Sequence, residues 1–178
     1  DFVLITCQTI RQALYFIKRR LFKMAIRKIV QNGDPILRTV CRPVEKFDKK
    51  LWDLLDDMQE TLKKADGVGL AAPQVGIRRR IFIMDVGEGL IEMINPVITE
   101  KTGEQREVEG CLSCPQQWGY VKRPEKCKVV SYNRKGEKVE YSLSGLAAIC
   151  ACHETDHLDG KLFIDFVDEF VNVEEKNK

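Results

Sequence analysis

The sequence predicts a domain of the α+β class. Two segments with helical patterning stand far apart in the chain, and short strand-like segments, two of them joined as a hairpin, lie between and after them. The length of 178 residues and the apolar fraction of 44% suit one domain with a core of its own and are short for two. We therefore expect a single domain, and no internal repeat is visible.

Two helices are expected. Asp48 can accept hydrogen bonds from the first free amides of a helix that continues to about residue 64. The apolar stripe of this helix consists of Leu51, Leu54, Leu55, Met58 and Leu62. A second helix is expected over residues 145–158, with Ser144 as its N-cap and Asp159-Gly160 as its stop.

The strand candidates are short apolar or alternating segments. They comprise residues 81–86, 91–98, 128–132, 137–141 and 162–167. The third and fourth flank Asn133-Arg134-Lys135-Gly136, a composition typical of a hairpin turn. Asn95-Pro96 is expected to interrupt the second candidate, because proline cannot donate to a strand ladder.

The first 23 residues differ from the rest. After Asp1 they contain no acidic residue, and apolar side chains recur at helical spacing as Ile10, Leu14, Ile17 and Leu21. Two interpretations are open: an organelle transit peptide, which is basic and amphipathic, or an extension or translated upstream sequence with Met24 as the natural start. We expect residues 1–23 to lie outside the folded domain, which then covers residues 24–178, with a polar tail at 174–178.

The composition excludes several classes of partner. The chain has 29 basic and 27 acidic residues, which is too even for nucleic acid or a membrane surface as the main partner. No apolar run approaches the roughly 20 residues of a spanning helix. The seven cysteines are an odd number, and no secretory signal precedes them, so reduced thiols in a cytosol-like compartment are expected.

The two histidines of the chain fall in one H-E-x-x-H motif, His153-Glu154-Thr155-Asp156-His157. On a helix, positions i and i+4 share a face, so both imidazoles can reach one metal ion while Glu154 stands beside it as an acid–base group. A helix with two surface histidines is the alternative. The apolar residues 146–149 before the motif indicate a buried helix, in which unpaired polar groups would be costly.

Two further segments are candidates for the same site. Glu109-Gly110-Cys111-Leu112-Ser113 offers a thiolate after a glycine, and Cys111 could complete a tetrahedral site with an open position. Residues 67–74, GVGLAAPQ, would let another chain approach the backbone, and Gln74 offers an amide to a polarised carbonyl oxygen. Taken alone, Cys111 could be a buried thiol and GVGLAAPQ a glycine-containing turn, but the latter lacks the spacing of a phosphate loop.

The three segments GVGLAAPQ, EGCLS and HETDHLDG closely resemble the motifs of the peptide deformylase family, in the same order and at similar separations. The resemblance runs from about Met24 to Val167. It implies a fold in which antiparallel strands pack around a central helix that carries the HExxH motif. It also implies a hydrolase that removes the formyl group from the N-terminal formyl-methionine of new polypeptides and releases formate.

Carried over residue by residue, the resemblance implies Cys111, His153 and His157 as metal ligands, Glu154 as the acid–base group, and the Gln74 side chain and Leu112 amide as oxyanion donors. It implies that the Gly69 backbone pairs with the substrate and that Glu109 pairs with Arg123. The substrate-binding residues, most of them around the methionine side chain, would be Val68, Gly69, Glu109, Gly110, Trp118, Leu146, Ile149 and Cys150.

The resemblance implies one Fe(2+) per chain, with Zn(2+) or Ni(2+) able to substitute, whereas the ligand types alone favour zinc. The expected partners are N-formylmethionyl nascent peptides and, transiently, the ribosome, with no nucleic acid or membrane bound directly. A cytoplasmic monomer is expected. Two positions depart from the family pattern: Cys152 replaces a usual glutamine, and Cys114 replaces a usual aliphatic residue.

Two other functions fit parts of the pattern. A zinc-dependent HExxH peptidase would need a downstream ligand, for which Glu169 is the candidate, and would leave EGCLS unexplained. A structural zinc-binding module would use Cys111-x-x-Cys114 with Cys150-x-Cys152 and would leave both histidines idle.

Overall fold

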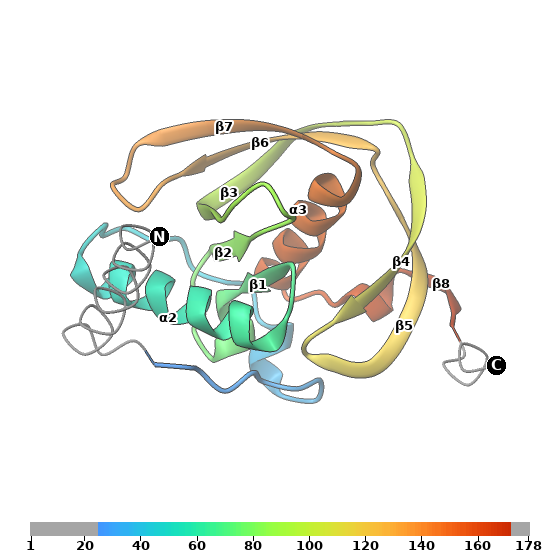
Figure 1. Ribbon diagram of the computed structural model, residues 1–178, viewed down its shortest axis with the longest axis horizontal. Helices are drawn as coiled ribbons and strands as arrows, with labels where there is room; N and C mark the ends of the chain where they lie inside the picture. Colours follow the sequence, from blue (N-terminus) through green and yellow to red (C-terminus); the bar gives the residue numbers. More distant parts are fainter. Residues whose placement is uncertain (1–24, 172–178) are drawn as a thin grey trace, which may run out of the picture.

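The computed structural model describes residues 25–171, which form two antiparallel sheets and two α-helices (Figure 1). The predicted α+β class is therefore confirmed. The expected N-terminal extension, residues 1–23, and the polar tail, residues 174–178, lie outside the described residues. Within residues 25–171, no helix is long and apolar enough to cross a membrane.

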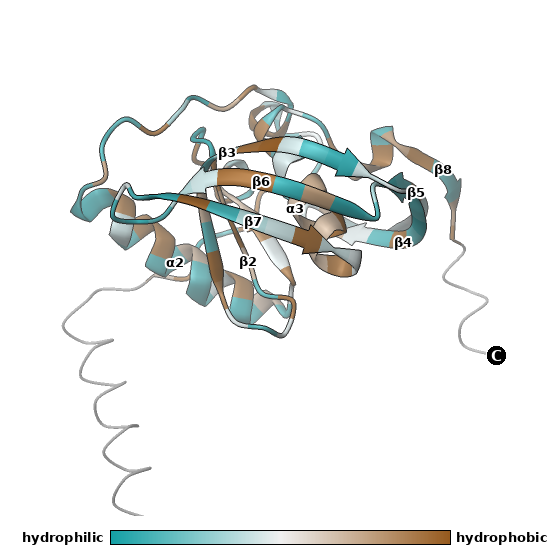
Figure 2. Ribbon diagram, turned by 90° about the horizontal axis from the view of Figure 1, so that it is seen from above, coloured by the Kyte–Doolittle hydropathy of each residue, from teal (hydrophilic) through white to brown (hydrophobic). Residues whose placement is uncertain are grey.

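The larger sheet has five strands in the order β1-β2-β3-β6-β7, and each neighbouring pair is antiparallel. Its strands are β1 (Gly69–Ala71), β2 (Ile81–Met84), β3 (Ile91–Thr102), β6 (Lys126–Tyr132) and β7 (Lys138–Ser144). The expected hairpin is β6–β7. Figure 2 views this sheet from the side away from α3 (Gly145–Leu158), and hydrophilic residues occupy the ends of β3 and β6 that pair with each other.

The smaller sheet has the order β4-β5-β8. Its strands are β4 (Gln105–Cys111), β5 (Cys114–Arg123) and β8 (Val167–Phe170). The expected strand over residues 162–167 is wrong, because Phe163–Asp165 is the 3₁₀ helix η3 and β8 begins only at Val167. The Asp165 carboxylate accepts a hydrogen bond from the Leu162 amide at 2.9 Å, which closes a local turn there.

The first helix, α2 (Lys49–Ala65), begins as expected. The Asp48 side chain accepts hydrogen bonds from the Lys50 and Leu51 amides. In α3, Ser144 occupies the N-cap position, but its side chain makes no capping bond. The Gly145 amide donates instead to the Glu125 carbonyl at 3.0 Å. Two more 3₁₀ helices, η1 (Pro35–Arg38) and η2 (Ala72–Val75), lie in the connections.

Strand β2 is buried on both faces because a helix packs on each side. Phe82 and Met84 belong to the core cluster that includes residues of α3, whereas Ile81 and Ile83 pack with the stripe of α2. All four β2 residues are buried. Figure 1 shows α3 between the two sheets, with α2 near the β1–β2 end. This arrangement explains why the β2 sequence is a short continuous apolar run rather than an alternation.

Asn95-Pro96 shifts the pairing of β3 but does not end the strand, which continues to Thr102. The expected interruption is therefore only a local bulge. The pairing with β6 shifts register between Ile94 and Val97, and Asn95 has a φ of 51°. The Asn95 side chain holds this bulge by accepting from the Val44 amide at 2.7 Å and donating to the Val44 carbonyl at 2.8 Å. The tertiary contact therefore compensates for the ladder bond that proline cannot make.

Gly160, just after α3, generates a prediction about stability. Its φ is +73°, and an added Cβ would lie 2.8 Å from the Arg38 carbonyl carbon in η1. We expect Gly160→Ala to lower the free energy of unfolding by about 2–4 kcal/mol, from left-handed backbone strain plus a clash with backbone that cannot rotate away. Urea unfolding measures this loss.

Gly76→Ala is the matched control, because Gly76 has a φ of +80° and no heavy atom within 4 Å of its added Cβ. The free energy of unfolding of this variant should fall by only about 1–2 kcal/mol, because left-handed backbone strain is its only cost. Equal losses in the two variants would show that contact with η1 does not set the requirement for glycine at position 160.

Candidate metal centre

Three side chains from two elements converge beside a cavity. Cys111 ends β4, and His153 and His157 lie one turn apart on α3. One ligand atom from each of Cys111, His153 and His157 lies within 4.8 Å of the others, and the Cys111 Sγ is 3.3 Å from the His157 Nε2. One sulfur and two imidazole nitrogens suit a zinc or iron ion with an open position for water or substrate.

A buried charge network orients His153. The Glu109 Oε2 lies 2.8 Å from the His153 Nδ1, and the same carboxylate accepts two hydrogen bonds from Arg123 at 2.7 and 3.1 Å. Arg123 also donates to Asp156, three residues after His153 on α3. With Nδ1 engaged by Glu109, the His153 Nε2 is left for the centre, as in the carboxylate–histidine pairs of metal sites.

The protonation states of this group follow from burial and from these contacts. Burial opposes ionisation of Glu109, but hydrogen bonds from His153 and Arg123 outweigh it and lower its pKa. Burial likewise opposes protonation of His153, but the hydrogen bond with Glu109 and the negative charges of Glu154 and Glu109 together outweigh it and raise the pKa. His157 has no such partner, so burial lowers its pKa well below the usual value and favours the neutral, metal-ligating imidazole.

Glu154 is buried beside the same centre. Burial raises its pKa to about 7, so the carboxyl can both accept and release a proton near neutral pH. Among the described residues, its Oε2 finds no hydrogen-bond partner. An unpaired buried carboxylate oxygen next to one thiol and two imidazoles fits a site that is completed by a cation and a water molecule.

Gly69 in β1 permits the close approach of α3. An added Cβ at Gly69 would lie 2.3 Å from the Glu154 Oε1 and 2.7 Å from the Cys150 Sγ. No larger residue fits without displacing these groups. Since β1 is an edge strand of its sheet, its other side remains available to a peptide beside the centre.

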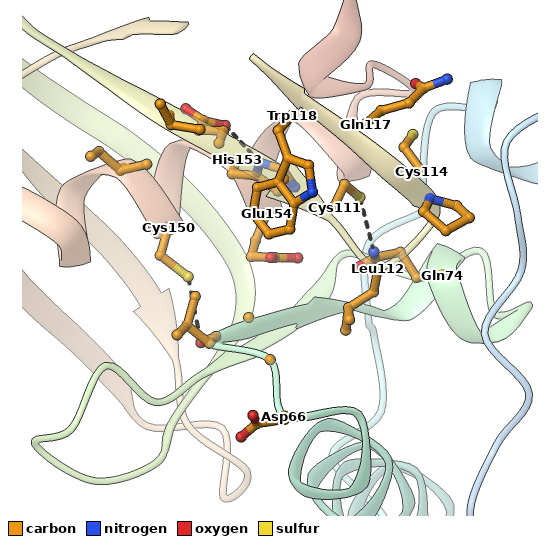
Figure 3. A pocket seen from close by; sticks show the side chains of 18 of the residues that line it. Asp66, Gln74, Cys111, Leu112, Cys114, Gln117, Trp118, Cys150, His153 and Glu154 are labelled. Atoms are coloured by element: carbon orange, nitrogen blue, oxygen red, sulfur yellow. Dashed lines mark hydrogen bonds and ion pairs between the residues drawn. The ribbon is translucent and has the colours of Figure 1, made fainter. Parts of the chain in front are cut away.

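Gln74 presents its amide to the centre. Its Oε1 accepts from the Ala71 amide at 2.8 Å, which leaves the Nε2 to approach the Cys111 Sγ at 3.5 Å and the Ser113 Oγ at 3.2 Å. Leu112 lies in the tight turn between Cys111 and Cys114 (Figure 3). The structure therefore brings Gln74 and Leu112 to the centre.

A cavity of about 480 Å³ opens onto this centre. All eight predicted substrate-binding residues line it: Val68, Gly69, Glu109, Gly110, Trp118, Leu146, Ile149 and Cys150. Ile149 and Cys150 are buried, while Val68, Trp118 and Leu146 are about half exposed. The cavity thus has an apolar wall beside a polar, ionisable floor, a combination typical of a binding site for a partly apolar ligand.

Several lining or supporting residues were not predicted. Asp66, Val108 and Gln117 also line the cavity, and Asp156 supports Arg123. Asp156 could have been found, since a carboxylate inside a buried helix needs a partner. No pattern in the sequence points to the other three.

The structure separates the residues that the two alternative functions require. Among the described residues, the Cys/His group contains Cys111 and both histidines but neither Cys114, Cys150 nor Cys152, which argues against a structural zinc module. Glu169 lies on β8 and pairs with Arg106 at 2.7 Å, outside that group. It therefore does not serve as the third ligand of a peptidase site.

Comparisons with known proteins agree on one family. The sequence model of the polypeptide deformylase family matches residues 26–172. The peptide deformylase of Acetivibrio thermocellus is 50% identical over 155 residues, covering 87% of this chain and 91% of that protein. Peptide deformylase 1 of Clostridium acetobutylicum is 54% identical over 142 residues, which cover 80% of this chain and 95% of that protein.

Solved structures show the same relationship. The crystal structure of peptide deformylase from Thermotoga maritima has a TM-score of 0.79 at 46% identity, covering 80% of this chain and 98% of that one. A class I type b peptide deformylase from Acinetobacter baumannii with Met-Ala-Ser bound has a TM-score of 0.78 at 33% identity, covering 81% and 99%.

Arg123 generates a prediction about the buried network. Arg123→Ala would leave the buried Glu109 and the half-buried Asp156 without their cation. We expect the free energy of unfolding to fall by about 3–5 kcal/mol, because an uncompensated charge would remain buried. Urea unfolding at matched metal content measures this effect.

Arg106→Ala is the matched control, because Arg106 also pairs with two carboxylates, Asp168 and Glu169, but at the surface. The free energy of unfolding of this variant should fall by no more than about 1 kcal/mol, because its ion pairs are exposed to solvent. Similar losses in both variants would contradict the assignment of burial as the cause.

Proposed function

This chain belongs to the peptide deformylase family, and on that premise we propose how its residues remove the formyl group from the N-terminus of a nascent polypeptide. The observation that carries the assignment is the convergence of Cys111, His153 and His157 beside the buried Glu154 at the cavity. The enzyme is a hydrolase: water and the formyl-methionyl amide give formate and a free methionine amine.

Cys111, His153 and His157 would hold a single metal ion, since the family is metal-dependent. We propose Fe(2+), with Zn(2+) or Ni(2+) able to substitute, and the one-sulfur, two-nitrogen donor set is compatible with all three. When bound, the ion supplies a Lewis acid that polarises the formyl carbonyl and makes water a nucleophile near neutral pH. The hydrogen bond that the His153 Nδ1 donates to Glu109 fixes the His153 ring for this task.

Glu154 would move the proton. It accepts a proton from the attacking water and then delivers it to the methionine nitrogen as the C–N bond breaks and formate leaves. Its raised pKa, about 7, supports both halves of this role. The Gln74 Nε2 and the Leu112 amide would donate to the carbonyl oxygen as it gains negative charge.

The substrate would lie along the free edge of β1. Its backbone would pair with Gly69, and its methionine side chain would enter the apolar part of the cavity beside Ile149 and Cys150. The tight space that Gly69 and the neighbouring backbone leave beside the metal centre would exclude acyl groups larger than formyl. The Met-Ala-Ser bound by the related Acinetobacter baumannii enzyme supports a peptide of this kind as ligand.

We further propose a cytoplasmic monomer that meets nascent chains at the ribosome transiently, with no direct contact with nucleic acid or membrane. The six described cysteines are free thiols, which supports a reducing compartment. The catalytic domain would span residues 24–178, with residues 1–23 as an extension outside it.

The role of Glu154 is testable by substitution. We expect Glu154→Ala to keep its metal but to lose turnover of formyl-Met-Ala-Ser by at least about 10²-fold, because the proton carrier is gone while the ligands remain. Formate release and metal content should be measured on the same anaerobic sample.

His157→Ala, one turn along α3, is the control and should lose the metal itself. Metal loss from the Glu154→Ala protein would instead make Glu154 a ligand, and the proposed role would be wrong.

The methionine pocket is testable with substrates. Formyl-Met peptides should exceed formyl-Gly peptides in kcat/KM by about 1.5–3 kcal/mol of transition-state binding, or roughly ten- to 150-fold, since the apolar wall buries the methionine side chain. Equal kcat/KM values for peptides that differ only at this residue would contradict the assigned pocket.

A further inference from the structure

Cys111 and Cys114 face each other across the tip of the β4–β5 hairpin. They are direct partners in the ladder, joined by the two-residue turn Leu112-Ser113. The ends of such a turn have Cα atoms within about 7 Å, and disulfides span Cα separations of about 4.4–6.8 Å. The backbone therefore holds these cysteines at a spacing that a disulfide can bridge.

The two thiols differ in access. Cys111 is partly exposed and lines the cavity, so a small oxidant can reach it from solvent. Cys114 is 2% exposed and packs in an apolar cluster with Leu37, Val121 and Phe163. Both residues belong to the lining of the cavity, and Figure 3 shows Cys114 farther from Glu154 than Cys111. An accessible thiol backed by a buried one is the arrangement of an attacking and a resolving cysteine.

We propose that Cys111 and Cys114 are a modification site, at which peroxide forms a reversible intramolecular disulfide when no metal is bound. The Cys111 sulfur attacks the peroxide O–O bond, which gives a sulfenic acid and one water. The Cys114 sulfur then attacks that sulfenic sulfur, so that an S–S bond forms, the S–O bond breaks and a second water leaves. Both thiols are oxidised and the peroxide is reduced to two waters.

The disulfide has two consequences for this chain. It occupies the sulfur that the proposed function assigns to the metal, so the oxidised protein cannot bind the ion. It also shields Cys111 from sulfinic and sulfonic acids, which a dithiol does not reduce. The formation of the disulfide rests on the hairpin alone, whereas its effect on metal binding rests on the proposed function.

A second pair serves as an internal control. Cys127 on β6 and Cys152 on α3 are both buried, each 3% exposed. Neither lines the cavity of the metal centre, nor belongs to the Cys/His group. If peroxide acts through the cavity, it should oxidise the hairpin pair before this one.

The test uses the full chain, metal-free and zinc-loaded, exposed to hydrogen peroxide and then alkylated and digested with trypsin. Cleavage after Arg106 and Lys122 releases residues 107–122, which contain Cys111 and Cys114 and no other cysteine. In the metal-free protein we expect this peptide to be two hydrogens lighter and unalkylated. Dithiothreitol should restore both free thiols and zinc binding.

Cys114→Val removes the resolving thiol and keeps the apolar cluster, and Cys114→Ser is a second variant in case the first packs poorly. Both should accumulate Cys111 sulfinic or sulfonic acid, and dithiothreitol should not recover zinc binding. Circular dichroism checks that each variant is folded.

The inference is overturned if the wild-type peptide carries only sulfinic or sulfonic acid, or if Cys127 and Cys152 oxidise while residues 107–122 stay reduced. Bound zinc should slow disulfide formation. If the disulfide formed at the same rate with and without zinc, the proposed disulfide would still be supported. The proposed role of Cys111 as a metal ligand would be contradicted.

Discussion

The ion-paired contact of Glu109 with Arg123 and His153 is the interaction on which the site depends. It joins β4, β5 and α3 through buried charged groups, so the smaller sheet and the helix are fixed relative to each other at the metal centre. Burying these groups is tolerable only because each has a partner, since an unpaired buried charge costs several kcal/mol. Any shift of β4 against α3 would therefore break the network and separate Cys111 from the two histidines.

A second constraint acts from the larger sheet. The absence of a side chain at Gly69 lets β1 approach α3, and this approach buries Glu154 with one oxygen unpaired. Burial is also what raises the pKa of Glu154 to about 7. The same close packing therefore sets the pKa of the carboxyl to which we assign the proton transfer.

The cysteines show how one position can change the behaviour of a site without changing its ligands. Cys114 is not part of the Cys/His group, yet the hairpin places it directly opposite Cys111. An aliphatic residue at position 114 could pack in the same apolar cluster but could not form a disulfide with Cys111. By our proposal, a thiol at this position gives Cys111 a competing partner when the metal is absent.

The sequence by itself determined the elements whose cause is local. The i, i+4 spacing of His153 and His157, the Asp48 cap of α2, and the β6–β7 hairpin all follow from a few neighbouring residues. The Asp165 turn and the Asn95 bulge escaped prediction because side-chain contacts to nearby or distant backbone decide them. Strands β4 and β5, in which charged and polar residues interrupt the apolar ones, carry no clear apolar signal. Only the tertiary structure decided that Asp156 shares Arg123 with Glu109 and that Cys114 faces Cys111. These pairings depend on how separate strands and a helix pack, and no local pattern encodes that distance.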